Sequence, residues 1–359
     1  MYNIIIYIQG DLLGMKKIRE ISLYEVFLCL FVILIHVLSG GIDGYIKGSY
    51  LSIAAFTFSR NVSFAVPAFI MASAIKLSGK FTNGKIHYFR FLKGRLAKVY
   101  LPFLLWVFIY YLYFVYHRNY FPFTIKDALY YLATGRIAAP FYFVIVIMQF
   151  YLLMPLWVKM FTTIGPRTGI TASILITLVS KYFTYGMASS NRIFLNYLMF
   201  WIIGCYIGSN YSKYITVLEK YKRSITVCSI IFTATYIVFA YMEFLDWFYL
   251  FSTEVLKYVF CIASALSLLL ICRRITLSAD TNKLCKVITA VSDTLSPTTF
   301  YVYLIHCLFI FETEFGMASH ERYNISELII VKALVAYTLP FAFSLLYCKL
   351  KGLLFRRKK

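Results

Sequence analysis

Residues 21–40 read ISLYEVFLCLFVILIHVLSG, and this stretch decides the fold of the protein. Glu25 is its only charged residue, and His36 lies toward its far end. A helix rises about 1.5 Å per residue, so the stretch would be about 30 Å long, which matches the hydrocarbon core of a bilayer. Lipid offers no hydrogen bonds to an open backbone, so a crossing segment must be helical or part of a closed barrel. We therefore predict a transmembrane helix here.

Similar stretches recur along the chain of 359 residues, of which 61% are hydrophobic and 14% charged. Soluble domains carry about 25% charged residues, so a soluble fold is excluded. Apolar runs of about 18–25 residues favour helices over the shorter alternating strands of a membrane barrel. We predict an all-α polytopic membrane bundle of about ten transmembrane helices, at residues 21–40, 51–76, 99–116, 139–158, 169–187, 194–211, 224–243, 254–272, 291–311 and 325–348.

The basic residues are distributed unevenly between the predicted loops. Many lie in loop 77–98 and in the C-terminal tail, whereas loop 117–138 on the other side holds few. Cytoplasmic loops are enriched in Lys and Arg, so this pattern predicts that both termini are cytoplasmic and that the number of spans is even. We expect a multi-pass protein of a bacterial plasma membrane.

The net charge of +21 is explained by the same topology. Because the basic residues gather in inner loops, they do not predict a nucleic-acid partner. The eight cysteines form no CxxC pair, which argues against a disulfide framework or a zinc site. No bound metal is expected.

Residues 1–14 differ from the rest of the chain. Their apolar part, Ile4 to Ile8, is too short to cross a membrane. The segment that begins at Met15 resembles a natural start of a membrane protein, so either Met1 or Met15 could be the true start. We expect residues 1–14 to be an N-terminal extension and residues 15–359 to form a single transmembrane domain.

Several polar residues lie inside predicted spans, where ionisable groups are costly and are usually kept for function. His36 and His306 each lie a few residues below the outer end of a span, so they share a depth and could line one outward-facing site. The alternative is that each histidine packs against a neighbouring helix. Arg60 lies near the middle of the second span, and Gln149 lies in the fourth. A buried guanidinium must face a cavity or an anion.

Two lysines, Lys181 and Lys332, lie nearer the outer face of their spans. Long cationic side chains at such positions can extend to the membrane surface, which is the simpler interpretation for both.

Several blocks of sequence occur together in order along residues 15–350. They are Arg19-Glu20-Ile21 leading to His36, the run from Arg60 to Ser73, the basic loop with Arg90 and Arg95 up to Tyr100-Leu101-Pro102, the run from Phe141 to Pro155, the run from Phe200 to Gly208, and the run from Phe300 to His306. In this order and spacing the chain resembles the membrane acyltransferase-3 family. Within it, the chain looks like the branch of intercellular-adhesin polysaccharide O-acyl and O-succinyltransferases.

The resemblance implies transfer of an acetyl or succinyl group from cytoplasmic acyl-coenzyme A to an extracytoplasmic polysaccharide or lipid-linked glycan. His36 matches the family's first-span histidine, the expected general base, with Arg60 and His306 as further catalytic candidates. Arg90 and Arg95 match basic residues expected to hold the phosphates of acyl-coenzyme A. Ser73 takes the place of a small-residue motif that ends the second span, and we group it with the donor site.

One position departs from the family pattern. The family usually has an arginine eleven residues before the first-span histidine, and this chain has Glu25 there. The aspartate often found three residues earlier is Ser22. Glu25 is expected near the inner end of the first span, paired with a basic residue such as Arg95 or as part of a different site arrangement.

A second function remains open on the sequence alone. An exporter or flippase of a polysaccharide or lipid-linked glycan would also be polytopic and would carry no acyl-transfer chemistry. Transporters often show matching halves with interrupted helices, and this chain shows no clear internal repeat. Surface glycan acceptors, membrane lipid and a polysaccharide synthase are the expected partners.

Overall fold

The computed structural model describes residues 18–44, 48–81, 85–247, 251–318 and 324–356. Within them every regular element is helical. The chain divides into two compact units: unit 1 comprises Met1–Ala72 and Tyr211–Lys359, and unit 2 comprises Ser73–Asn210. This all-helical architecture confirms the predicted polytopic membrane bundle.

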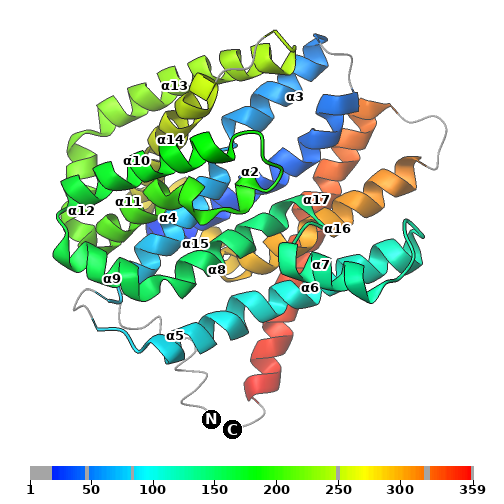
Figure 1. Cartoon of the computed structure of the whole chain (residues 1–359), viewed down its shortest axis with the longest axis horizontal. Helices are drawn as coiled ribbons and strands as arrows, with labels where there is room; N and C mark the ends of the chain where they lie inside the picture. Colours follow the sequence, from blue (N-terminus) through cyan, green and yellow to red (C-terminus); the bar gives the residue numbers. More distant parts are fainter. Residues whose placement is uncertain (1–17, 45–47, 82–84, 248–250, 319–323, 357–359) are drawn as a thin grey trace. The chain divides into compact units, whose positions relative to one another are not determined.

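The longer helices of unit 1 include a central first helix, α2, against which most of the others pack. They are α2 (Arg19–Gly44), α3 (Tyr50–Asn61), the first part of α4 (Ala65–Ser78), α12 (Tyr211–Lys220), α13 (Lys222–Phe244), α14 (Phe251–Leu277), α15 (Lys283–Leu295), α16 (Thr299–Ala318) and α17 (Ile325–Arg356). Helix α2 contacts α3, α14, α15, α16 and α17. Pairs α13–α14 and α16–α17 pack side by side as antiparallel neighbours (Figure 1).

Apolar side chains and backbone-directed hydroxyls hold α2 in the centre of unit 1. Ile33 and Val37 of α2 are buried against Val302 of α16. Tyr24 donates its hydroxyl hydrogen to the carbonyl of Ala265 at 3.0 Å, and Tyr337 donates to the carbonyl of Leu30 at 2.9 Å. Buried tyrosines usually find such partners, so these contacts fix the helices that carry the polar residues of unit 1.

Unit 2 consists of shorter and more irregular helices. They are α5 (Tyr88–Arg95), α6 (Leu101–Leu112), α7 (Ile125–Thr134), α8 (Tyr142–Leu152), α9 (Met154–Thr163), α10 (Pro166–Thr184) and α11 (Leu198–Ser209). Two π-helical segments, Leu96–Tyr100 and Tyr113–His117, flank α6. Gly208 of α11 lies so close to the carbonyl of Ile75 that a Cβ there would clash with the carbonyl oxygen, so this contact requires glycine.

Each of the ten predicted spans corresponds to helical structure, but not every one is a long transmembrane helix. Seven helical stretches in the described residues are long and apolar enough to cross a membrane. An eighth is formed if Ile125–Thr134 and Ala139–Leu152, which are bent by 58°, act together as one broken span. The bend lies at residues 135–138, just before the fourth predicted span, so the broken span would include Ile125–Thr134, which the prediction left in a loop.

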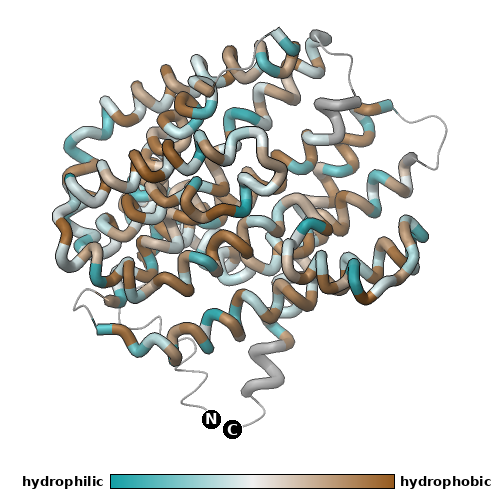
Figure 2. Tube along the Cα trace, in the orientation of Figure 1, coloured by the Kyte–Doolittle hydropathy of each residue, from teal (hydrophilic) through white to brown (hydrophobic). Residues whose placement is uncertain are grey.

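The fifth and sixth predicted spans account for the remaining difference. The helix at Pro166–Thr184 begins with Pro166-Arg167-Thr168 and includes Lys181, so it does not meet the apolar criterion of a span. The stretch Phe194–Ser209 is apolar but shorter than a full crossing. Figure 2 shows that apolar residues predominate along the helices, with polar residues interspersed among them.

Candidate functional site

The two histidines predicted to share a depth lie beside each other in unit 1. The ring centroids of His36 on α2 and His306 on α16 are 5.3 Å apart, with the ring planes inclined by 46°. Helices α2 and α16 pack directly against one another. His306 is fully buried, whereas His36 is partly exposed. The structure therefore brings together two ionisable rings that are 270 positions apart in the sequence.

Both ring nitrogens of His306 have partners on its own helix. Nδ1 lies 3.1 Å from the carbonyl oxygen of Val302, one turn earlier, and a carbonyl can only accept, so Nδ1–H donates. Nε2 lies 3.4 Å from the thiol sulfur of Cys307, which in a neutral ring donates to it. These contacts select one tautomer and one ring orientation. His306 is therefore held as a fixed neutral imidazole.

His36 differs from its neighbour. No side chain or carbonyl in the described part of the chain hydrogen-bonds its ring nitrogens. Its backbone carbonyl accepts from the hydroxyl of Ser39 at 2.8 Å, which leaves the ring unaffected. An imidazole that is positioned by packing, with both nitrogens open, can accept a proton from an incoming hydroxyl.

The structure adds a buried ion pair beside this site that the sequence interpretation missed. Lys332 of α17 is completely buried and pairs with Glu314 of α16, and its charge also acts on His36. The expectation that Lys332 extends to the membrane surface is therefore wrong. One signal in the sequence could have revealed this ion pair. The lysine and the glutamate are 18 residues apart, and they lie in two successive apolar helices that form an antiparallel pair.

His36, His306 and Cys307 together offer three potential metal ligands. One donor atom from each lies within 4.8 Å of the others. Two imidazoles and a thiol suit zinc or copper. However, both ring nitrogens of His306 are already used, by the Val302 carbonyl and by the Cys307 thiol. The arrangement fits proton transfer better than metal binding.

Arg60 lies in a different part of unit 1. It is in the last turn of α3, and its guanidinium carbon lies 4.9 Å from the centroid of the Phe56 ring. The Nε atom is buried and has no hydrogen-bond partner in the described residues. The ring beneath Arg60 belongs to its own helix, α3, and the charge of Arg60 acts on Lys257 of α14. The structure thus groups Arg60 with these helices and not with the histidines.

The expected donor-site residues lie in unit 2. Arg90 is exposed on α5. Arg95 ends that helix, and its guanidinium carbon lies 5.3 Å from the Phe91 ring and 5.6 Å from the Tyr151 ring. The first π-helical segment begins directly after Arg95, and such segments are rare and often occur at functional sites. Ser73 is half-buried in α4, and Glu25 is half-buried in α2 of unit 1.

Gln149 is a structural residue. Its amide nitrogen donates to the carbonyls of Arg192 at 2.7 Å and Ile145 at 3.2 Å, and its amide oxygen accepts from the Phe194 amide at 3.3 Å. The side chain thus ties α8 to the connection before α11. A polar residue in a span can therefore serve the fold alone.

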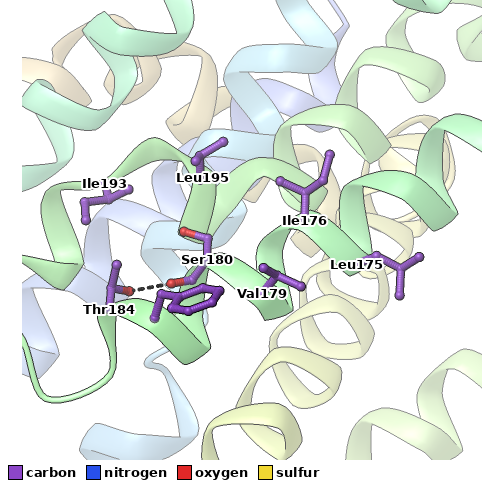
Figure 3. Close-up of a pocket in the computed structure, with 8 residues that line it drawn as sticks. Leu175, Ile176, Val179, Ser180, Thr184, Ile193 and Leu195 are labelled. Carbon is purple, nitrogen blue, oxygen red and sulfur yellow. Dashed lines mark hydrogen bonds between the residues drawn. The ribbon is translucent and has the colours of Figure 1, made fainter.

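Unit 2 also contains an apolar pocket of about 490 Å³ along α10. Figure 3 shows that Leu175, Ile176, Val179, Ile193 and Leu195 line it together with the hydroxyls of two further residues. Those hydroxyls are already used: Thr184 donates to the Ser180 carbonyl at 2.9 Å, and Ser180 donates to Asn196 at 2.7 Å. The pocket holds no acid, base or cation, so it offers no catalytic group.

Comparison with known proteins adds one match that covers most of the chain. Residues 18–347 match the model of a family described as an acyltransferase domain. The matched region includes the histidine pair, Arg60 and the basic helix α5. No curated protein and no solved structure matches the chain.

Proposed function

We propose that this chain, which belongs to the acyltransferase-3 family and is therefore a membrane-bound acyl-transfer enzyme, moves an acetyl or succinyl group from acyl-coenzyme A to an extracytoplasmic glycan. The acceptor is a hydroxyl of a surface polysaccharide or of its lipid-linked precursor. The observation that carries the proposal is the histidine pair, in which one ring is fixed by its own helix and the other is open.

The chemistry assigned to His36 is general-base catalysis. Its neutral ring accepts the proton of the sugar hydroxyl while the hydroxyl oxygen attacks the thioester carbonyl. The carbon–sulfur bond then breaks, and the departing thiolate takes up the proton that the imidazole received. The acyl group ends on the sugar oxygen, coenzyme A leaves as its thiol, and the imidazole returns to its neutral form.

His306 is assigned a positioning role in the same site. Its hydrogen bonds to Val302 and Cys307 leave it no open nitrogen, so it packs beside His36 and limits the orientations of that ring. Lys332 of α17 is held in its ion pair with Glu314 of α16, and α17 packs against both α2 and α16.

Arg90 and Arg95 are proposed to bind the phosphates of the acyl donor, with Ser73 near the donor as a small residue. Arginine offers several donors in one plane and suits phosphate groups. The aromatic rings beside Arg95 hold its guanidinium in a fixed orientation, which supports a binding role. Acyl-coenzyme A is then a co-substrate.

The proposed setting is a bacterial plasma membrane with both termini in the cytoplasm. Because the proposed acceptor is a polymer outside the cell, a polysaccharide synthase is the expected partner of the enzyme. Such an acceptor is also the one expected for the adhesin-modifying branch of the family. An exporter or flippase remains the competing interpretation, and the experiment below separates the two.

The test is the mass of the surface glycan from cells with and without the chain. The account predicts that the polymer is present in both, and that one acyl group on a fraction of its sugars is lost without the chain. Cells that carry His36→Gln should give the same loss while the protein stays in the membrane. Loss of the whole polymer from the surface, with no change in acylation of the remainder, would instead support export.

A further inference from the structure

Buried polar atoms without partners are concentrated in one part of unit 1. Six such side-chain atoms occur in the described residues, and four of them belong to α3, α13 and α14. These four are the hydroxyls of Ser52, Tyr241 and Thr253 and the Nε of Arg60. Buried polar groups nearly always have a partner, so a group of unpaired ones marks a place where a molecule outside the chain supplies the hydrogen bonds.

Ring contacts link the helices that carry these atoms. The Phe56 ring of α3 lies 5.2 Å from the Tyr241 ring of α13, and the guanidinium carbon of Arg60 lies 4.9 Å from the centroid of the same Phe56 ring. Tyr236 stacks on Phe260 at 5.0 Å, which aligns α13 with α14. Helices α13 and α14 run side by side, and α13 also contacts α3 (Figure 1).

The three hydroxyls lie at the same end of their helices. Ser52 is the third residue of α3, Thr253 is the third residue of α14, and Tyr241 is the fourth residue from the end of α13. The chain turns between α13 and α14 at this end. In the predicted topology this is the outer side of the membrane, where a glycan would arrive.

The two cations of this region differ in their partners. Lys257 lies 4.0 Å from the Glu254 carboxylate, and Glu243 and Asp246 add carboxylates at the end of α13, whereas the Nε of Arg60 has no hydrogen-bond partner in the described residues. Tyr236, Tyr258 and Cys261 are the further titratable groups that act on Lys257. The side chain of Lys257 is 37% exposed and that of Glu254 25% exposed, so the region can be reached from outside.

We propose that α3, α13 and α14 form a binding site for a sugar that carries an acidic group, with Arg60 and Lys257 on the acid and the three hydroxyls on the sugar. The planar guanidinium suits a carboxylate or a phosphate, and hydroxyl groups can both donate to and accept from a sugar. The site defines the acceptor class of the proposed acyl transfer, and to that extent rests on it. The shared chemistry is a hydroxyl-rich anion, whether its acid is a carboxylate or a phosphate.

The test measures binding to the purified full-length chain by calorimetry, with glucuronate and glucose 6-phosphate as acidic probes and glucose as the neutral probe. The parent should bind at least one acidic probe at least about tenfold more tightly than glucose, because a hydrogen bond to a charged group is worth about that factor. Which acidic probe binds more tightly distinguishes a carboxylate from a phosphate acceptor.

Variants locate the site. Arg60→Met should weaken the acidic probe by about tenfold to a hundredfold, and Arg60→Lys should restore little if a planar contact is used. Lys257→Met should weaken it less. Ser52→Ala and Thr253→Ala keep the charge and should lower affinity for acidic probes a few fold, so they test the site even if the arginine variants fold poorly. Lys181→Met removes a cation from a helix of unit 2 and is the matched control, which should bind like the parent.

Equal binding of acidic and neutral sugars by the parent would overturn the proposal, and so would unchanged binding in the alanine variants. If the same protein acylated a neutral glycan and bound no acidic probe, the proposed binding site would be refuted while the proposed acyl-transfer function would stand. Tight binding of acidic probes without any acyl transfer would keep this site and contradict the proposed function.

Discussion

The histidine cluster between α2, α16 and α17 and the polar group on α3, α13 and α14 are two polar regions within unit 1, and they differ in how well their atoms are satisfied. In the first, His306 and Lys332 have partners within the chain, and one ring, His36, is left open. In the second, four buried atoms have no hydrogen-bond partner in the part of the chain that the structure describes.

The difference indicates that the two regions have different roles, one in catalysis and one in binding. A reactive group needs a fixed surrounding, so its neighbours are satisfied by the fold and one atom stays available. A binding site needs atoms that the ligand will satisfy, so several stay unpaired until it arrives. Substitutions in the first region should therefore change kcat, the rate of the chemical step. Substitutions in the second region should change the KM for the acceptor.

The largest expected effect is therefore a split between two kinetic constants. His36→Ala should lower kcat by about 10²–10⁴, the usual cost of losing a general base, with little change in the acceptor KM. Arg60→Met should raise the acceptor KM and leave kcat nearly unchanged. Steady-state acylation by protein in vesicles measures both. If His36→Ala changed the KM alone, or Arg60→Met lowered kcat alone, the division between the regions would be lost.

The next effect concerns the acyl donor. Replacing both Arg90 and Arg95 with Gln should raise the Kd for acyl-coenzyme A by about tenfold or more, because charge-assisted contacts to phosphate are removed. Binding of labelled donor to purified protein provides the measurement.

The control for the donor variant removes the same charge elsewhere on the predicted inner face, as Lys220→Gln with Lys222→Gln. It should bind the donor normally. Equal binding by the arginine variant and the parent would reduce Arg90 and Arg95 to topology determinants.

A smaller effect is expected at His306. His306→Ala should lower kcat by less than about tenfold, since the ring positions His36 and does not accept the substrate proton. His306→Asn, which keeps a donor toward Val302, should recover part of the rate. A positioning role is supported by that partial recovery, whereas a loss as large as that of His36→Ala, with no recovery, would make His306 a proton acceptor.

The smallest effect on activity is expected at Gln149. Gln149→Leu should lower the free energy of unfolding of the protein by about 1–3 kcal/mol, because the Arg192 carbonyl and the Phe194 amide lose their partner. The kcat of the folded variant should not change. Unfolding in detergent measures the stability, with Phe183→Leu on the exposed face of α10 as the control. A large fall in kcat at normal stability would assign Gln149 to the active site.

Much of the fold follows from hydropathy because lipid requires long apolar helices. The predicted helical positions were recovered, including the long helices of unit 1 such as α2 and α17. The prediction of a full transmembrane helix failed for two helices that each have only one of the two required properties. Pro166–Thr184 is long but too polar, and Phe194–Ser209 is apolar but too short. The bend near residues 135–138 depends on Gly135, whose φ of +63° ends α7, and a hydropathy average does not register one such residue.

The candidate site was less predictable. Depth in the membrane suggested that His36 and His306 could meet, but which helices touch is decided by tertiary packing. The sequence could not separate Gln149, which the fold satisfies, from Arg60, which it leaves unpaired. It also could not show that Lys332 turns inward to Glu314, because that choice depends on the face that α17 presents to α16.

The most direct test of the central claim is single-turnover acyl transfer by His36→Gln in vesicles, with donor and glycan both saturating. Glutamine retains hydrogen bonding and polarity but cannot take a proton. The account predicts normal protein level, normal binding of both substrates and a loss of about 10²–10⁴ in the rate. Transfer at nearly the parental rate would contradict the assignment of His36 as the general base.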